Sequence, residues 1–359
     1  MNIPALRLQH QHIAQPRLTQ PEQVVAWLGG LQGQDYPGVK WSIALRMPSA
    51  TEADVVQAFD TGKLVRTWPM RGTLHVVAAQ DLRWMLMLTS PKNLASSASR
   101  RRALELDDTT LARCREVFTQ ALQGGKHLSR EDMYAALAQA HIAIAGQRGY
   151  HILWNCALHG LICLATSNDK EQNFALVDEW IAPTPSTTRD EALAELAARY
   201  FLSRGPATLQ DFIWWSGLSA AEARSGLEAV RHRLVSDTVG KLTYWLPATS
   251  HTPKEAPTAF ALPGFDEYLL GYKDRSAVLD AAHAEKTCPG GNGVFAATIV
   301  IDGRVVGTWK RVFKKTGIDI ATTPFTHLSP ADAQRFAAAV QRYGAFYKLP
   351  VRVVSDFGL

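Results

Sequence analysis

The feature that most constrains the fold is a pattern of two helical segments followed by two short strands, which occurs three times in the chain. The helical segments begin at candidate caps such as Thr51, Thr208 and Ser219. Two helices and a hairpin are the elements of a winged helix, which is a helix-turn-helix with a β wing. One copy is typical of many α+β folds, but three copies favour tandem winged helices. The hairpin strands are predicted at 63–68 with 72–77, at 161–164 with 173–177, and at 234–236 with 242–245.

The C-terminal part of the chain has a different pattern, in which strands predominate. Its strongest local signal is Asp302-Gly303, a dipeptide typical of tight hairpins, which joins two apolar runs. We expect a small β-sheet or partial barrel with one helix in this part. The predicted strands are 295–301, 304–311 and 350–354, and the predicted helix is 330–343.

A length of 359 residues exceeds that of one ordinary domain. Segments rich in Pro, Ser and Thr at 182–188 and 247–253 are typical of linkers. The predicted fold class is therefore α+β, with three tandem winged-helix motifs followed by a β-barrel-like C-terminal domain. An unrelated α+β protein with similar helices is the alternative. The predicted domains are 1–105, 106–185, 186–250 and 251–359.

Composition narrows the class of protein. With 38 Lys and Arg against 33 Asp and Glu, the formal net charge is +5, which is compatible with a polyanionic partner but does not require one. No apolar run is long enough to cross a bilayer, and residues 1–7 lack the pattern of a signal peptide. The four cysteines form no Cys-x-x-Cys pair and no Cys/His cluster at zinc spacing. We therefore expect a protein of the reducing cytoplasm that needs no structural metal.

Two glutamines after the first predicted helix are the first candidate site. Gln32 and Gln34 are two residues apart, so in extended backbone their side chains point the same way. Two carboxamides can orient one water molecule or hydrogen-bond the edge of a base. An amide has no pKa near neutrality, so it cannot act as a true general base. The alternative is an ordinary polar loop between two helices.

The predicted hairpin of the first unit carries a second candidate site. Arg66, Arg71 and His75 would gather positive charge where a wing can meet a phosphate backbone. The basic run that includes Lys310 and Arg311 is a further candidate for phosphate contacts. In both cases the alternative is a set of cations that face solvent without a ligand.

A third candidate lies at 262–275, where acids, aromatics and bases alternate closely. Asp266 or Glu267 could serve there as an acid–base or electrostatic group in an active-site wall, together with Trp68 from the first hairpin. The alternative is a structural bridge that packs the C-terminal domain onto the helices. The sequence contains no glycine-rich phosphate loop, metal motif or nucleophile elbow.

Four segments together resemble the AlkZ-type DNA glycosylases, which with the YcaQ-like proteins form a superfamily of winged-helix DNA glycosylases. The resemblance implies three tandem winged helices and a β-barrel-like domain that form a concave DNA-binding face. It places the family's catalytic Gln-x-Gln signature on Gln32 and Gln34, whereas the YcaQ-like branch has Asp at the second position. The segments span nearly the whole chain in the family's order and are 31–35, 68–75, 262–272 and 302–310.

This resemblance implies a monofunctional DNA glycosylase that hydrolyses the N-glycosidic bond of N7-alkylated purines and can unhook interstrand crosslinks. An N7-alkylated purine already carries positive charge, so the enzyme needs mainly a placed water and stabilisation of a cationic sugar. The implied partner is double-stranded DNA with alkylated bases or crosslinks. We expect no cofactor, no membrane, a monomer, and a nucleoid-associated location in the cytoplasm. The rival class is a non-catalytic winged-helix DNA binder such as a transcriptional regulator.

Overall fold

The computed structural model describes residues 1–167, 172–251 and 259–355. The end of the predicted linker at 247–253 lies outside these residues. Within the described ranges, no helix combines the length and the apolar character that a membrane span requires.

The first repeat of the sequence pattern forms a unit around a short antiparallel sheet. β1 pairs with β3 and β3 with β2, so the strand order is β1-β3-β2. Thr51 and Asp54 form a capping box at the start of α4, as the predicted cap requires. The elements are α1 (Ile3–His10), α2 (Pro21–Leu28), β1 (Leu31–Gln32), α3 (Tyr36–Ala44), α4 (Glu52–Asp60), β2 (Leu64–Thr67) and β3 (His75–Ala78).

The second repeat has the same order of elements and shares a sheet with the first. β4 pairs with β6 and β6 with β5, while β5 also pairs with β2 through Arg66 and Leu164. The six strands therefore run in the order β1-β3-β2-β5-β6-β4. Helices α5 (Leu82–Ser96) and α6 (Ala98–Ala103) connect the two units. The second unit contains α7 (Asp108–Leu122), β4 (Leu128–Ser129), α8 (Arg130–Gln139), α9 (Arg148–Leu158), β5 (Ile162–Ser167), β6 (Gln172–Leu176) and α10 (Val177–Trp180).

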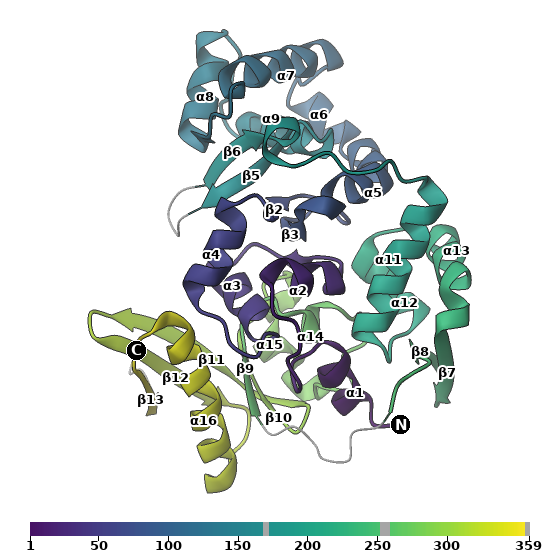
Figure 1. Cartoon of the computed structure of the whole chain (residues 1–359), viewed down its shortest axis with the longest axis vertical. Coiled ribbons are helices and arrows are strands. Elements are labelled where there is room, and N and C mark those ends of the chain that lie inside the picture. Colours follow the sequence, from purple (N-terminus) through teal and green to yellow (C-terminus); the bar gives the residue numbers. More distant parts are fainter. Residues whose placement is uncertain (168–171, 252–258, 356–359) are drawn as a thin grey trace.

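The third repeat lies beside the first two (Figure 1) and keeps the same order. Thr208 and Ser219, the predicted caps, accept hydrogen bonds from backbone N–H groups in the first turns of α12 and α13. A single bridge between Ala207 and Trp245 takes the place that β1 and β4 have in the other units. The elements are α11 (Arg189–Arg204), α12 (Leu209–Ser216), α13 (Ala220–Val230), β7 (Leu234–Val239) and β8 (Leu242–Pro247).

The C-terminal part is one five-stranded sheet with the order β13-β12-β11-β10-β9. Asp302 and Gly303 have φ values of 48° and 81° and form the predicted turn between β10 and β11. The elements are β9 (Ala259–Leu262), α14 (Glu267–Leu270), α15 (Ala284–Thr287), β10 (Thr298–Ile301), β11 (Arg304–Lys314), β12 (Gly317–Pro324), α16 (Pro330–Tyr347) and β13 (Val351–Ser355). Short 3-10 turns lie at 79–81, 231–233, 281–283 and 289–291.

This sheet is open, so the expectation of a β-barrel-like domain is wrong in that respect. Among the described residues, β9 and β13 are its two edges and do not pair with each other. β13 lies at the edge and pairs in parallel with β12. This direction is possible because α16, which connects the two strands, returns the chain to the start of the sheet. The helix packs on the sheet, and its contacts with β9 are the most extensive. A helix therefore covers apolar surface that a barrel would enclose.

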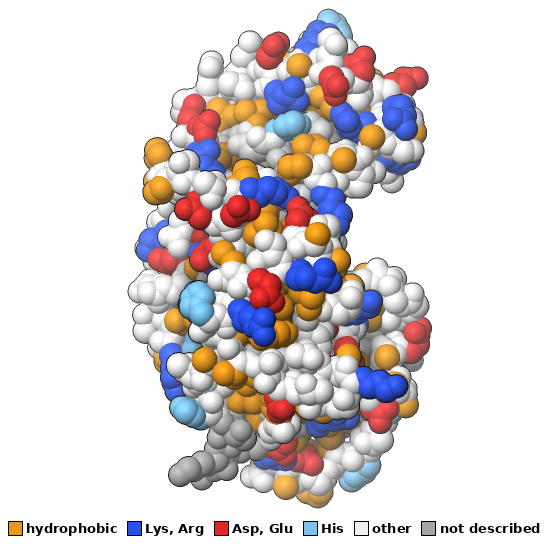
Figure 2. All heavy atoms as spheres, turned by 90° about the vertical axis from the view of Figure 1, so that its right-hand side faces the viewer, with side chains coloured by type: hydrophobic (Ala, Val, Ile, Leu, Met, Phe, Trp, Pro, Cys, Tyr) orange, Lys and Arg blue, Asp and Glu red, His pale blue; other side chains and the backbone are white. Residues whose placement is uncertain are grey.

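Among the described residues, three hydrophobic clusters hold the molecule together, and they cross the predicted domain boundaries. The largest joins the first unit to the C-terminal sheet, where the ring of Trp41 meets that of Tyr343 edge-on at 5.2 Å between centroids. The second joins the first and second units and includes Trp68. The third surrounds α11 and α12 and includes Met70 and Tyr272. The connection between β2 and β3 therefore lies where the units meet. In the side view, the outline of the molecule is hollowed between its upper and lower parts (Figure 2).

Candidate active site

Gln32 ends β1, and Gln34 lies in the turn that leads into α3. The segment is extended because β1 pairs with β3, where Gln32 stands opposite His75. The backbone N–H of Gly33 donates to the carbonyl oxygen of Leu74 at 2.8 Å, which continues the pairing by one residue. The predicted extended backbone is therefore confirmed for Gln32, whereas Gln34 lies in a bend beyond the end of the strand.

The two glutamine side chains contact each other. Gln32 Nε2 donates to Gln34 Oε1 at 2.7 Å, and the Thr73 hydroxyl donates to Gln32 Oε1 at 3.4 Å, a long hydrogen bond. Gln32 is 6% exposed, whereas Gln34 is exposed. A carboxamide oxygen has two lone pairs, so each of these oxygens can accept one further hydrogen bond. The pair therefore combines a fixed geometry with unused acceptor capacity.

A row of polar side chains extends behind Gln32 on the same face of the sheet. Gln32, His75 and Thr67 stand opposite one another on β1, β3 and β2, and residues in register share a face. His75 Nδ1 lies 2.7 Å from the carbonyl oxygen of Thr73, so Nδ1 carries the hydrogen and Nε2 is an acceptor. His75 Nε2 and Thr67 Oγ1 are buried and have no hydrogen-bond partner among the described residues. Burial lowers the pKa of His75 to about 3, so the ring is neutral at physiological pH.

Arg66 lies beneath the glutamine segment and is 1% exposed. Its guanidinium stacks on the Tyr36 ring at 4.5 Å from the centroid, and Nη1 is 3.4 Å from the carbonyl oxygen of Gly33. Burial lowers the pKa of Arg66 to about 10, which keeps it charged at neutral pH. The expectation of an exposed, positively charged wing at Arg66 and His75 is wrong. The reason is that β2 pairs with β5 of the second unit, which makes this hairpin the centre of a six-stranded sheet.

Arg71 joins the first unit to the third. Its Nη1 donates to the carbonyl oxygens of Trp214, at 3.1 Å, and Trp215, at the end of α12. The last carbonyls of a helix lack intrahelical partners and attract cations. The guanidinium also stacks on Trp214 at 4.7 Å from the ring centroid. These contacts make Arg71 a link between units, and its predicted phosphate contact stays a prediction.

The two basic residues of β11 differ in their surroundings. Arg311 Nη2 lies 3.0 and 3.2 Å from the two carboxylate oxygens of Asp35, next to Gln34. Burial opposes the charge of Arg311, but Tyr343 and Asp35 raise its pKa. The C-terminal sheet is thus tied to the turn that carries Gln34. Lys310 follows the alternation of the strand to the other face and is exposed. Phosphate contacts of both residues stay predictions.

The interpretation of Trp68, Asp266 and Glu267 as an active-site wall is wrong, because all three are sealed inside the protein. Trp68 is 5% exposed and belongs to the second hydrophobic cluster. Asp266 pairs with both terminal nitrogens of Arg46, at 2.9 Å each. Glu267 is fully buried, and its Oε2 accepts from Arg204 Nη2 at 2.7 Å. The alternative, a structural bridge between the C-terminal part and the helices, is what the structure has.

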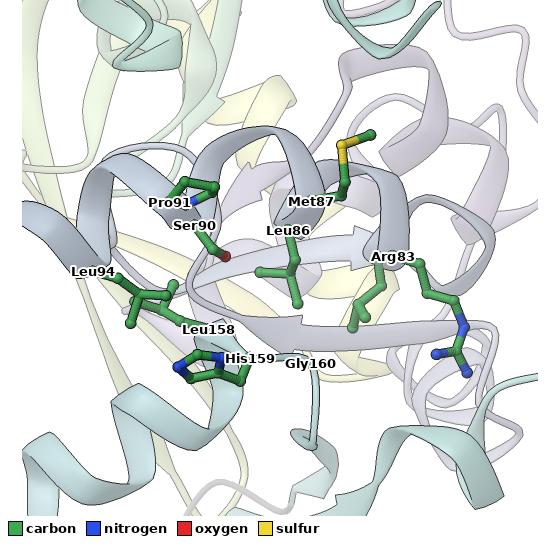
Figure 3. Close-up of a pocket in the computed structure, with 10 residues that line it drawn as sticks. Arg83, Leu86, Met87, Ser90, Pro91, Leu94, Leu158, His159 and Gly160 are labelled. Atoms are coloured by element: carbon green, nitrogen blue, oxygen red, sulfur yellow. The ribbon is translucent and has the colours of Figure 1, made fainter. Parts of the chain in front are cut away.

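A separate pocket of about 370 Å³ lies between α5 and the end of α9. Figure 3 shows Leu86, Leu94 and Leu158 gathered beside His159, while Met87 points away from them. None of the described residues that line this pocket takes part in the glutamine site. It therefore does not extend the candidate site.

Sequence reasoning missed three residues that shape the glutamine site. Tyr36 supports Arg66, and Thr73 contacts Gln32. Gly264 lets another segment approach, because a Cβ there would lie 2.8 Å from the carbonyl oxygen of Phe295 and 3.8 Å from the Asp35 carboxylate. All three residues stand within or beside the segments that were singled out, but no local pattern shows that Gly264 meets Phe295 and Asp35.

Comparison with known proteins decides the family. The family model described as "DNA glycosylase AlkZ-like" matches residues 25–346, from α2 to α16. The chain belongs to the AlkZ-like DNA glycosylase family. It is therefore an enzyme of the DNA glycosylase class, and the resemblance that the four sequence segments indicated is confirmed. The alternative interpretation, a non-catalytic transcriptional regulator, is therefore no longer supported.

Two relatives agree with this assignment. An interstrand DNA cross-link repair glycosylase of Streptomyces sahachiroi is 28% identical over 375 residues, with 98% of each chain covered. The solved structure of the DNA glycosylase AlkZ from the same organism matches with a TM-score of 0.79 at 25% identity and 98% coverage of each chain. The mixed α+β fold is thus the fold of this family.

Proposed function

We propose that the chain hydrolyses the N-glycosidic bond of N7-alkylated purines in double-stranded DNA, using a water held by Gln32 and Gln34. The contact between the two carboxamides carries the proposal, because it holds together two side chains that each have an acceptor oxygen. Membership of a DNA glycosylase family supports the class of reaction. The Gln-x-Gln spacing supports a role for these two residues rather than for the buried carboxylates.

The geometry suits a water that donates both of its hydrogens. Gln32 Oε1 and Gln34 Oε1 each keep one lone pair after the contacts described above. A water bound to both oxygens has its own lone pair free to attack C1′ of the sugar. The new C1′–O bond forms as the C1′–N9 bond breaks, and the electron pair of that bond neutralises the cationic purine as it leaves. The water then releases one proton to solvent. The amide dipoles stabilise the positive charge that develops on the sugar.

No general acid is needed in this scheme, because an N7-alkylated purine leaves as a neutral base. The titratable groups beside the glutamines are not available as general acids. Asp35 pairs with Arg311, and His75 is buried and neutral. Such a site would favour labile lesions, since an uncharged purine is a poorer leaving group. We extend the proposal to interstrand crosslinks formed through N7, in which hydrolysis of one glycosidic bond releases one strand; the name of the Streptomyces relative supports this extension.

We further propose that the three repeated units are winged helices within the boundaries 1–105, 106–185 and 186–250, followed by a C-terminal domain at 251–359. The repeated order of helices and hairpin strands supports this division. The hollow visible in Figure 2 would hold duplex DNA against a monomer of the protein. Lys310 is the best-exposed of the predicted phosphate contacts, and Arg71 and Arg311 would approach the DNA at the junctions between units. The protein would act on the nucleoid in the cytoplasm.

The experiment that tests the proposal uses a duplex with one N7-methylguanine, under single-turnover conditions. We expect release of N7-methylguanine, detected by chromatography, together with abasic sites that break on heating in alkali. The same duplex with an unmodified guanine should stay intact. Tight binding of the damaged duplex without base release would contradict the proposal and return the regulator as the better interpretation.

A further inference from the structure

Gln34 lies between two anchored segments of the chain. The pairing of β1 with β3 ends at Gly33, whose N–H donates to Leu74, and α3 begins at Tyr36. Gln34 is exposed, and among the described residues its side chain hydrogen-bonds only to Gln32. The position of the Gln34 carboxamide therefore depends on what fixes the turn that follows it.

Asp35, the next residue in this turn, does not act as an ordinary helix cap. It is the N-cap residue of α3, where an Asp usually accepts a hydrogen bond from the second or third N–H of the helix. Asp35 makes no such bond, and Pro37 at the second helical position has no N–H to donate. Arg311 Nη2 instead lies 3.0 Å from Asp35 Oδ1 and 3.2 Å from Oδ2. The carboxylate thus serves a contact 276 positions away rather than its own helix.

Arg311 is held in place by the C-terminal domain. Trp309, Arg311 and Phe313 share one face of β11, because residues two apart in a strand point the same way. The ring of Trp309 meets that of Tyr343 in α16 at 5.3 Å between centroids. The ring of Phe313 meets that of Tyr347, one turn further along α16, at 5.0 Å. The arginine that binds Asp35 therefore lies between two aromatic contacts that fix β11 on the helix.

Two glycines leave room for the Asp35 carboxylate. A Cβ on Gly38, in the first turn of α3, would lie 2.3 Å from Asp35 Oδ2. A Cβ on Gly264, just before α14, would lie 3.8 Å from the same oxygen. The carboxylate therefore occupies space that a side chain at position 38 would fill, and three separate segments of the chain meet around it.

We propose that Asp35 and Arg311 are positioning residues, whose ion pair ties the turn that carries Gln34 to the C-terminal sheet and so holds the Gln34 carboxamide against that of Gln32. The inference rests on the proposed function, since it assumes that Gln34 orients the attacking water. The side chains of Asp35 and Arg311 are 28% and 19% exposed, and ion pairs that water can reach contribute little to the stability of a fold. Loss of the pair should therefore slow the reaction more than it destabilises the protein.

Gly38→Ala tests the contact without removing either charge. The added methyl group should displace the carboxylate, which ends a flexible side chain, and Ala favours a helix more than Gly does, so the urea midpoint should not fall. Single-turnover release of N7-methylguanine at saturating protein should slow about tenfold, because small displacements of a catalytic group are costly. Affinity for the duplex should stay near that of the parent protein.

Asp35→Ser removes the carboxylate but keeps a residue that caps helices well, and it should slow release to a similar extent. Parental rates in both Gly38→Ala and Asp35→Ser would overturn the proposal. Asp302→Asn is the matched control, because it weakens another ion pair of the same domain, with Arg335 at 2.8 Å, and should leave the rate unchanged.

Substitutions of Arg311 test whether its charge is what holds the turn. Arg311→Met and Arg311→Lys both lose the predicted phosphate contact geometry of the guanidinium, so their rates are compared at saturating protein. Arg311→Lys should keep more of the parental rate than Arg311→Met, because it retains a cation for Asp35. Equal losses in the two variants would overturn an electrostatic tether.

Hydrogen exchange makes the test independent of base excision. Amide exchange over residues 31–39, measured by mass spectrometry, should be faster in Asp35→Ser and Gly38→Ala than in the parent protein and in Asp302→Asn. Unchanged exchange in both variants would overturn the proposal even if the parent protein excises N7-methylguanine. If the parent protein excises none, the proposed function fails, while faster exchange in both variants still supports the tether.

Discussion

Two polar pairs in this protein, Gln32 with Gln34 and Asp266 with Glu267, look equally suited to chemistry in the sequence but have opposite surroundings. Asp266 is 4% exposed and accepts four hydrogen bonds, two of them from Arg46. Burial alone would raise the pKa of Asp266, but the charge and hydrogen bonds of Arg46 hold that pKa below its ordinary value. The glutamine pair has an exposed member and free lone pairs on both oxygens.

The difference shows that residue type alone does not reveal which polar groups remain accessible to a ligand. Carboxylates are stronger catalysts than amides, but here both carboxylates are bound by buried arginines. The weaker groups are left available to a ligand. Four predictions test this contrast, in decreasing order of expected effect.

Glu267→Ala should cause the largest loss of stability. The substitution leaves Arg204 buried without its partner, and an unpaired buried charge costs about 3–5 kcal/mol. The midpoint of unfolding of the full chain in urea should fall accordingly. The double variant Arg204→Met with Glu267→Leu should recover much of that loss, because it removes both charges. A stable Glu267→Ala protein that cannot excise bases would show instead that the carboxylate is catalytic.

Gln32→Ala and Gln34→Ala should each slow base release on the order of 10²-fold, since an oriented hydrogen bond in the transition state is lost. Urea midpoints and affinity for DNA should stay near those of the parent protein. In the proposed scheme both amides hold one water, so the double variant should lose less than the product of the two single effects. Gln123→Ala, at an exposed glutamine of the second unit, is the matched control. Unchanged single-turnover rates in both single variants would show that the glutamines are an ordinary loop.

His75→Asn should reduce the dependence of stability on pH. The pKa of His75 is about 3 in the folded protein, against roughly 6.5 in the unfolded chain. The contribution of His75 to folding stability is therefore complete above its pKa in the unfolded chain. It is lost as the pH falls toward the pKa in the folded protein, at up to about 1.4 kcal/mol per pH unit. Urea midpoints between about pH 6 and pH 4 measure this slope. An identical slope in the variant would mean that His75 is accessible to protons in the folded state.

Lys310→Ala should have the smallest effect. Lys310 is exposed, so its loss should leave the fold intact and weaken binding to all DNA sequences alike by a few fold. The slope of log affinity against log salt should become shallower by about 1, as one phosphate contact is lost. Glu116→Ala removes an exposed acidic side chain of the second unit and controls for general changes in surface charge. A salt slope equal to that of the parent would remove Lys310 from the DNA-binding surface.

Much of the fold followed from local signals in the sequence. The caps at Thr208 and Ser219, the Asp302-Gly303 turn and the three hairpins could be predicted because each depends on residues within a few positions of one another. The contact between Gln32 and Gln34 is local as well, because the two residues are two positions apart, although only Gln32 lies in a strand. The helices between the first two units were not predicted; α5 even contains Pro91, which normally opposes a helix.

Only the tertiary structure decided which polar residues are available to a ligand. Arg46 and Asp266 are 220 positions apart, and Arg204 and Glu267 are 63 apart, so no local pattern could show that these charges neutralise each other. The burial of Arg66 and His75 likewise depends on the pairing of β2 with a strand of another unit. The sequence alone determined which polar side chains are candidates for the chemistry, because their spacing along the chain is local. Their exposure was decided by long-range packing, because burial depends on what the rest of the chain brings against each face.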